Sequence, residues 1–267
     1  MATATATATA TANNRVINNM AEFGLTDLHT HILPGIDDGA KDLNAALQML
    51  QAQKASGVER VALTPHFYPL EETLDEFLSK RQQAWELLLS GWDGGTMPEL
   101  RLGAEVHFSS CLADMDLQEL TLYKTDYMLL ELPDIMQPTF LEPVLQQMLD
   151  RGITPILAHV ERCAYFAEKP AKLQHLVEMG VLAQISLRMF SNKRMRKFAE
   201  ICLQKNAAQI IASDIHGLGN ASFGVLTEGM HEELVERAER IAKAVWDNIQ
   251  LQPIAPIPIQ KKLFGYA

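Results

Sequence analysis

Histidines and acidic residues, which are common ligands of divalent metal ions, recur where short β-rich runs of this sequence end. The first run, LTDLHTH, ends in His29 and His31, whose side chains point to the same face of a strand because they lie two residues apart. Two neighbouring imidazoles can bind one ion. An H-x-H pair also arises by chance, so the pair alone leaves two interpretations open, a metal site and two packed histidines.

Later β-rich runs add residues of the same types. Glu131 lies in the apolar run YMLLELP, where an unpaired carboxylate is costly, so it requires a cation or a buried arginine as its partner. Active sites of α/β barrels lie at the carboxyl ends of the strands. The alternative is that these histidines pack in the core with ordinary hydrogen-bond partners. It must then account for five histidines at or near strand ends. The candidates at or near predicted strand ends are His29, His31, His66, Glu105, Glu131, His159, Asp214 and His216.

The donor types indicate which metals fit. Imidazole and carboxylate ligands without thiolate favour Mn, Fe or Zn in an open catalytic site over a cysteine-rich structural zinc site. Glu105 is the candidate for a carboxylate that bridges two ions. The cysteines, Cys111, Cys163 and Cys202, are scattered and odd in number, which is typical of a reducing compartment and predicts a cytoplasmic protein.

The elements that must position these residues alternate between strand and helix. Several junctions, such as LDRGITPILAH, place a Gly between a helix and a β-branched run, as an αβ loop requires. The alternation predicts an α/β fold with a parallel sheet, either a barrel or a doubly wound open sheet. We expect strands at 25–32, 58–64, 100–107, 126–132, 153–159, 181–187 and 208–214, and helices at 42–55, 71–90, 139–150, 169–179, 194–205 and 224–248.

Length and composition set the remaining limits. The 267 residues suit one catalytic domain at 23–250, preceded by a disordered low-complexity tail at 1–22 and followed by a Pro-rich extended segment at 251–267. A net charge of −10 disfavours a nucleic-acid partner. No apolar run reaches the roughly 20 residues that span a bilayer, so no stable membrane insertion is expected.

Six segments together resemble the polymerase-and-histidinol-phosphatase (PHP) superfamily. They are DLHTHILPGIDDGAKD (27–42), LTPH (63–66), GAE (103–105), LLELP (129–133), AHVER (158–162) and SDIHG (213–217). More narrowly, HILPGIDDGAKD resembles the manganese-dependent protein tyrosine phosphatases of bacterial capsule and exopolysaccharide operons. The resemblance covers about residues 25–220.

The resemblance implies a distorted (β/α)7 TIM-like barrel that holds three divalent ions, with Mn²⁺ expected first and Fe or Zn as alternatives. It implies that a water between two ions attacks phosphorus, with Glu105 and His159 among the catalytic residues and Arg162 holding the phosphate. The implied substrate is the phosphotyrosine tail of a membrane-associated tyrosine kinase, and a homo-oligomer is possible. Carried over by position, the ligand sets are His29, His31, Glu105 and Asp214; Glu105, Glu131 and His159; and Asp38, His66 and His216.

The sequence also departs from the family pattern. The arginine usual after the D-x-H motif is absent from GLGNASFG (217–224), and Arg188, Lys193 and Arg194 are the candidates to replace its charge. No cysteine has an arginine six residues downstream, the spacing of cysteine-dependent tyrosine phosphatases, so we expect metal-based chemistry.

Secondary roles and other functions stay open. Asp27 and Asp37 are expected to support neighbouring ligands, and His107 is expected to be a packed histidine, with a supporting role beside Glu105 as the alternative. The alternative functions are a small-molecule phosphatase of the histidinol-phosphate type, a non-catalytic regulatory protein that retains the fold, and a nuclease-like module. The acidic charge counts against the last of these.

Overall fold

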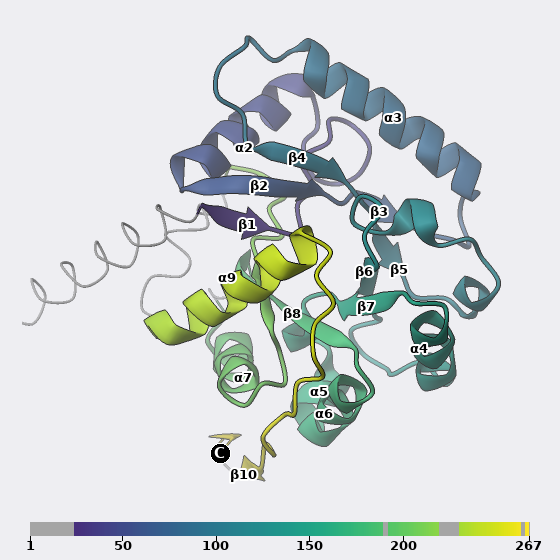
Figure 1. The fold of residues 1–267 in the computed structure, drawn as a ribbon, viewed down its shortest axis with the longest axis vertical. Coiled ribbons are helices and arrows are strands. Elements are labelled where there is room, and N and C mark those ends of the chain that lie inside the picture. The colour runs from purple at the N-terminus through teal and green to yellow at the C-terminus, as the bar shows by residue number, and fades with distance from the viewer. Residues whose placement is uncertain (1–23, 189–191, 219–229, 263–264, 267) are drawn as a thin grey trace, which may run out of the picture.

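The computed structural model describes residues 24–188, 192–218, 230–262 and 265–266, so the tail expected at 1–22 lies outside the described residues. All strands of the main body run parallel, in two sheets whose strand orders are β1-β2-β4 and β3-β5-β6-β7-β8-β9 (Figure 1). The strands are β1 (Leu25–Asp27), β2 (Val58–Leu63), β3 (His66–Phe67), β4 (Glu99–Leu102), β5 (Glu105–His107), β6 (Tyr127–Glu131), β7 (Thr154–Leu157), β8 (Leu182–Ser186) and β9 (Ile210–Ala212).

Backbone hydrogen bonds join the two sheets at both edges. Between β4 and β5, the Gly103 and Glu105 amides donate to the carbonyls of Leu63 and Pro65, so the ladder continues across a short break. At the other edge the His31 amide donates to the Ile215 carbonyl at 3.1 Å, and the Asp214 amide donates to the His29 carbonyl at 3.0 Å. The parallel α/β fold is therefore as expected. Hydrogen bonds between the first and last strands agree with a distorted barrel and not with an open doubly wound sheet.

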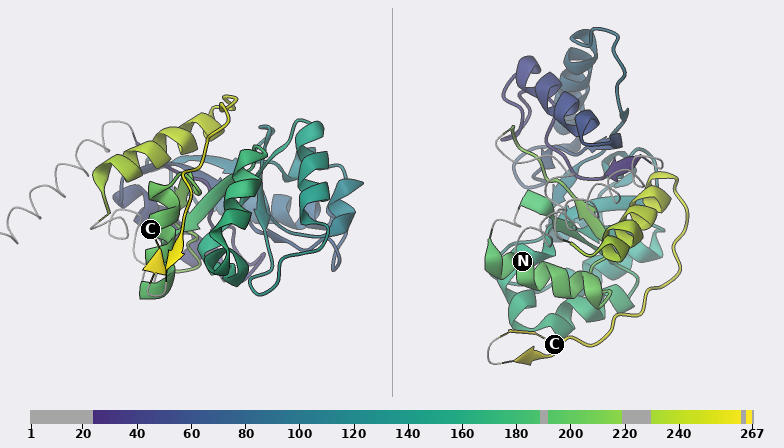
Figure 2. Two further views of the ribbon diagram at one scale, coloured as in Figure 1. Left: turned by 90° about the horizontal axis from the view of Figure 1, so that it is seen from below. Right: turned by 90° about the vertical axis from the view of Figure 1, so that its left-hand side faces the viewer.

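Helices pack outside the strands (Figures 1 and 2). Helix boundaries follow local capping: the Asp42 carboxylate accepts the Ala45 amide, and Thr73 and Glu76 form a capping box, which starts the second helix later than expected. The helices are α2 (Leu43–Ala55), α3 (Leu74–Ser90), α4 (Leu141–Asp150), α5 (Ala164–Glu168), α6 (Pro170–Glu178), α7 (Lys193–Gln204) and α9 (Glu232–Trp246). Short 3-10 turns are η1 (Ser110–Ala113), η2 (Gln118–Leu120) and η3 (Val160–Arg162).

Several other expected elements also differ from the structure. The strand at 25–32 ends at Asp27, after which only Thr30 pairs, and the strand at 100–107 is interrupted at 103–104. The helix expected at 224–248 begins at Glu232, and its part at 224–229 lies outside the described residues. Of the described helices, none combines the length and the apolar character needed to cross a membrane.

The hydrophobic core has two parts. The larger cluster fills the space between strands and outer helices. A second cluster lies among the strands, with Leu129, Ile156 and Ile210 as members, and packs against Val245 and Trp246 of α9. The cluster includes Tyr127, Leu182 and Ile210, the first residues of β6, β8 and β9, so α9 covers the amino-terminal end of the strands. The carboxyl ends of the strands are left for polar residues.

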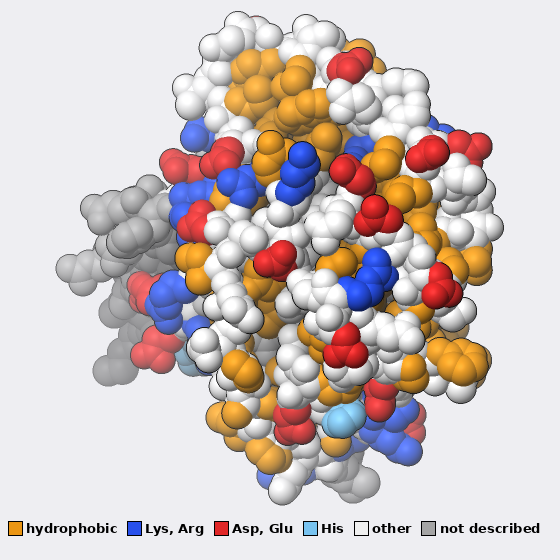
Figure 3. Space-filling model, turned by 45° about the vertical axis from the view of Figure 1, so that its right-hand side comes forward, with side chains coloured by type: hydrophobic (Ala, Val, Ile, Leu, Met, Phe, Trp, Pro, Cys, Tyr) orange, Lys and Arg blue, Asp and Glu red, His pale blue; other side chains and the backbone are white. Residues whose placement is uncertain are grey.

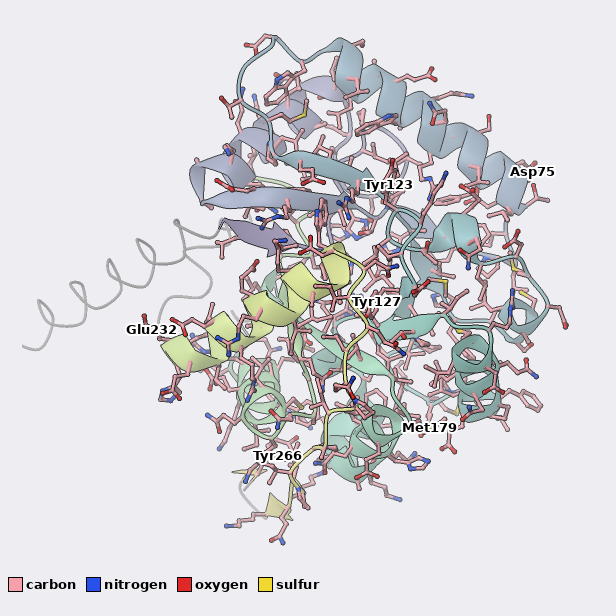
Figure 4. The ribbon with its side chains drawn as sticks, viewed as in Figure 1. Asp75, Tyr123, Tyr127, Met179, Glu232 and Tyr266 are labelled. Atoms are coloured by element: carbon pink, nitrogen blue, oxygen red, sulfur yellow. The ribbon has the colours of Figure 1, made fainter. Side chains whose placement is uncertain are left out.

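The segment expected to be extended at 251–267 lies along the body of the protein. The Leu251 amide donates to the Tyr127 hydroxyl at 3.3 Å, the Ile259 amide donates to Gln174 Oε1 at 3.0 Å, and Figure 4 shows Tyr127 beside this segment. Strand β10 (Lys261–Lys262) pairs antiparallel with β11 (Gly265–Tyr266), which the sequence did not predict. On the face drawn in Figure 3, acidic and basic side chains are interspersed, and no continuous basic patch is visible there.

Candidate metal centre

The carboxyl ends of the strands bring the predicted ligand residues together. His29 and His31 follow β1, His66 follows β2 as the first residue of the short strand β3, and Glu105 follows β4 as the first residue of β5. Glu131 ends β6. His159 and Asp214, which follow β7 and β9, both have left-handed backbone conformations with φ of 32° and 54°. Non-glycine residues in this region carry a cost of order 1–3 kcal/mol, so the surrounding structure must enforce both positions.

Four buried donor atoms form the first group. The Nε2 atoms of His29 and His31 lie 3.0 Å apart, and each lies 3.1 Å from Glu105 Oε2. Each also lies 3.7 Å from Asp214 Oδ1. These separations suit ligands that share one ion at about 2.1 Å.

The hydrogen bonds made by the Nδ1 atoms of His29 and His31 show which nitrogen of each ring can bind a cation. His29 Nδ1 lies 3.2 Å from Gln184 Oε1, and His31 Nδ1 lies 2.8 Å from Asp37 Oδ2. Both oxygens only accept, so each neutral ring carries its proton on Nδ1 and turns the Nε2 lone pair inward. Glu105 Oε2 has no hydrogen-bond partner. In their neutral form both rings therefore turn a lone pair toward this carboxylate, and this donor set fits a metal ion.

The electrostatic field at the site also favours a cation. Burial lowers the pKa of His29, but the charges of Glu105 and Asp214 outweigh it and raise that pKa to about 8. Burial raises the pKa of Glu105, but the surrounding imidazoles, His29 first among them, hold it well below its usual range. The carboxylates thus stay ionised and stabilise positive charge at this point.

Glu105 lies at the centre of the cluster because its two oxygens face different partners. Oε1 lies 2.7 Å from His159 Nε2, which in turn lies 3.7 Å from Glu131 Oε1. Oε2 faces the first group and lies 3.1 Å from His66 Nδ1. A carboxylate in this position has the geometry of a bridge between two ions.

A third group lies nearer the surface. Asp38 Oδ1 lies 3.5 Å from His66 Nε2 and 3.3 Å from His216 Nε2. The Asp38 side chain is 67% exposed. The structure therefore brings together all nine residues expected as ligands.

The segment IDDG, residues 36–39, contacts two of these donor groups. Asp37 accepts the His31 ring proton and the Gly39 amide, while Asp38 reaches the third group. A Cβ at Gly39 would lie 2.1 Å from the His31 carbonyl oxygen, so only glycine fits there. Asp37 supports a ligand as expected.

Asp27 also supports its neighbours as expected. Its Oδ1 accepts the amides of His29 and Ser213, and its Oδ2 accepts the Gln53 amide group at 2.6 Å. Burial raises the Asp27 pKa, while these hydrogen bonds oppose the increase.

Sequence reasoning missed two polar residues and misjudged a third. Gln184, fully buried in β8, accepts from the His29 ring and from the His159 amide, and Gln53 contacts Asp27. A glutamine inside the apolar run VLAQISL was the available signal. The expectation that His107 is packed was wrong, because its side chain is 37% exposed and its Nδ1 lies 3.2 Å from Glu131 Oε2.

Two arginines flank the cluster. Arg162 Nη1 lies 3.4 Å from His159 Nε2, and its Nη2 donates to Asp134 at 3.2 Å. Arg188 Nη1 lies 3.0 Å from His216 Nδ1, which itself faces the Asp214 carbonyl at 2.9 Å. The other candidates for the missing charge, Lys193 and Arg194, are exposed at the start of α7.

The sequence at 25–227 matches the family described as capsular polysaccharide synthesis, CpsB/CapC. The tyrosine-protein phosphatase YwqE of Bacillus subtilis is 30% identical over 267 aligned residues, which cover 91% of this chain and 100% of the relative. The tyrosine-protein phosphatase CpsB of Streptococcus agalactiae is 26% identical over 215 residues, covering 73% of this chain and 84% of the relative.

The fold of this chain also matches a solved structure. The chain matches one of the crystal structures of YwqE from Bacillus subtilis and CpsB from Streptococcus pneumoniae, described as unique metal-dependent tyrosine phosphatases. The TM-score is 0.77 at 25% identity, and the match covers 88% of this chain and 100% of that one. The fold, the grouped donors and both relatives agree, and this chain belongs to the CpsB/CapC family.

Proposed function

We propose that this protein is a metal-dependent protein tyrosine phosphatase that acts in capsule or exopolysaccharide synthesis. The observation that carries the proposal is the position of Glu105, whose two oxygens face the histidines of separate donor groups. The names of the matched relatives support the reaction class.

We assign the donor groups to three divalent ions, with Mn²⁺ as the proposed metal and Fe or Zn as alternatives. Bound ions of this kind supply a water nucleophile and neutralise phosphate charge. The four carboxylates leave an excess of about +2 on three divalent ions, which attracts phosphate within an acidic protein. The proposed ligands are His29, His31, Glu105 and Asp214 for the first ion; Glu105, Glu131 and His159 for the second; and Asp38, His66 and His216 for the third.

The two flanking arginines hold the phosphate in this proposal. Arg162 reaches it from the His159 side, and Asp134 fixes the direction of its guanidinium. Arg188 reaches it from the His216 side. The His216 Nδ1 atom donates to the Asp214 carbonyl, so it cannot also accept from Arg188, and the guanidinium is left with donors for an anion. Arg188 thereby replaces the arginine missing after the D-x-H motif.

The leaving group explains why phosphotyrosine suits this site. A phenolate has a conjugate acid of pKa about 10, so it needs less help from a general acid than an alkyl oxygen does. We propose the tail of a membrane-associated tyrosine kinase as the substrate and the cytoplasm as the location. A homo-oligomer stays a prediction.

The test is a substrate panel after purification without chelator and measurement of the bound metal. Phosphotyrosyl peptide should be hydrolysed far faster than phosphoseryl peptide or histidinol phosphate, and a preference for histidinol phosphate would favour the small-molecule alternative. His159→Ala and Asp214→Ala should each lower turnover by about 100-fold or more. His175→Ala, at an exposed histidine on α6, is the matched control and should keep normal turnover. Near-normal rates in both ligand variants would contradict the assignment.

A further inference from the structure

A cleft of about 940 Å³ opens beside the donor groups. Three segments at the carboxyl ends of strands form its walls: the turn after β3, residues 107–110 after β5, and residues 131–140 between β6 and α4. Sites for small ligands enclose about 300–1,000 Å³. This cleft lies at the upper end of that range, so it has room for more than one small phosphate ester.

Large apolar side chains of this cleft are exposed to water. Ile135, Leu70 and Met136 are 86%, 81% and 76% exposed, the three highest values for large hydrophobic side chains in the described part of the chain. Phe140, at the end of the same β6–α4 loop, is 62% exposed. Apolar side chains gathered at one exposed place are typical of a binding surface.

The cleft is continuous with the donor groups. Glu131 and Arg162 line the cleft, and both contact His159 within the cluster. Tyr68 also lines the cleft, and its ring stacks on His66 with 5.4 Å between centroids. A phosphate held by Arg162 therefore has its ester group, and whatever is attached to that group, at the entrance of the cleft.

The walls of the cleft offer few positive charges to acidic ligands. Arg162 is the one lysine or arginine among its described lining residues, and Asp134 already pairs with it at 3.2 Å. Glu131 is the other carboxylate on the wall, and His107 faces it. Acidic side chains next to a phosphotyrosine would meet no lysine or arginine among these described lining residues other than Arg162, whereas apolar side chains would meet the exposed hydrophobic loop.

We infer that this cleft binds the polypeptide on either side of the phosphotyrosine and selects apolar over acidic neighbours. The inference rests on the function proposed above and names the part of the substrate that the protein recognises. A small phosphate ester leaves Leu70, Ile135 and Met136 in water. A peptide with apolar residues beside its phosphotyrosine covers them, so binding removes apolar surface from water on both partners.

The experiment compares the metal-loaded wild type with the double variant Ile135→Ser/Met136→Ser. The substrates are a phosphotyrosyl peptide with leucines beside the tyrosine, the same peptide with glutamates there, and p-nitrophenyl phosphate. Wild type should prefer the leucine peptide. The double variant should raise KM for that peptide about 5- to 10-fold, with kcat and the kinetics of p-nitrophenyl phosphate unchanged.

A matched control removes two exposed leucines from α3, away from the cleft. Leu87→Ser/Leu89→Ser removes side chains that are 46% and 42% exposed and should leave all three substrates unaffected. The unphosphorylated leucine peptide should inhibit p-nitrophenyl phosphate hydrolysis competitively in wild type and about 5- to 10-fold more weakly in the cleft variant.

The outcomes separate the two proposals. If wild type hydrolyses p-nitrophenyl phosphate but no phosphotyrosyl peptide, the proposed function fails and this inference fails with it. If both peptides are hydrolysed and the cleft variant keeps the wild-type KM, only the inference is overturned. A cleft variant that changes oligomeric state by sedimentation but not peptide KM would identify this face as a subunit contact, which also overturns it.

Discussion

Replacing Gln184 by methionine should weaken metal binding although Gln184 is not a proposed ligand. Its Oε1 accepts from the His29 ring at 3.2 Å and from the His159 amide at 3.0 Å, while its Nε2 has no hydrogen-bond partner. Methionine has nearly the same shape and removes only the acceptor. Without it, the His29 proton is free to move to Nε2, where it would occupy the lone pair that faces the ion.

The magnitude follows from the two lost hydrogen bonds. Loss of the carboxamide oxygen leaves two buried N–H donors without a partner, each costing about 1–3 kcal/mol, so we expect about 2–6 kcal/mol less stability. Partners that orient a ligand typically change metal affinity about 10- to 100-fold. That range corresponds to about 1.4–2.7 kcal/mol of binding free energy.

The assay is calorimetric titration of the metal-stripped protein with Mn²⁺, alongside unfolding of the same samples in urea. Gln209→Met is the control, because Gln209 is equally buried and accepts the Ala183 amide at 2.9 Å. It should lose similar stability and keep wild-type metal affinity. Equal Mn²⁺ affinity in Gln184→Met and wild type would refute the reasoning that Gln184 fixes the His29 tautomer.

Three further predictions address other parts of the structure. Arg162→Ala should lower kcat/KM for phosphotyrosyl peptide about 100- to 1,000-fold and Arg188→Ala at least about 10-fold, with bound metal unchanged by elemental analysis; normal rates would remove both from the phosphate site. Gly39→Ala should lower both the unfolding midpoint and the Mn²⁺ affinity, because the new Cβ collides with the His31 carbonyl; unaltered values would show that the turn can shift. Burial raises the pKa of Glu239 to about 7, against the hydrogen bond from the Thr26 amide, so the folded state holds this proton more tightly. Stability should therefore fall as pH rises from about 4.5 to 7, and urea unfolding of Glu239→Gln should show a flatter pH profile, with a profile like that of wild type as the contrary result.

The alternation of strands and helices was predictable from the sequence because the residues that end each helix are recognisable locally. Gly57 and Gly152, read as the residues that end helices, have φ of +84° and +78°, which suits glycine after a helix. Strand lengths were less predictable. Asp27 ends β1 early because the chain leaves the ladder to place His29 and His31, and no local pattern of residues signals that departure.

Members of the cluster were predictable where a histidine or an acidic residue lies at the end of an apolar run that predicts a strand. Histidines and acids stand out against apolar runs, so His159 and Glu131 were found. Gln184 was missed because a glutamine has no metal chemistry of its own, and its importance comes from a contact with His29, 155 residues away. His107 was misjudged for the same reason, because its partner Glu131 belongs to another strand.

The side of each strand that faces inward also could not be predicted, because parallel strands covered on both faces are apolar throughout and show no alternation. In the structure, the inward-facing side chains of two strands change from apolar to polar toward the carboxyl end of the strand. In β8, Leu182 belongs to the inner apolar cluster, Gln184 accepts from the His29 ring and the His159 amide, and the Ser186 hydroxyl donates to Asp214 at 3.0 Å.

Strand β6 repeats this gradient with Leu129 in the inner cluster and Glu131 among the donors. Both strands therefore contribute apolar packing at the end that α9 closes and polar groups at the other end. Because donors from many strands meet there, a bound ion links segments that are distant in sequence. Metal binding and folding stability should consequently be coupled in this protein, since ions that bind only the folded state stabilise it.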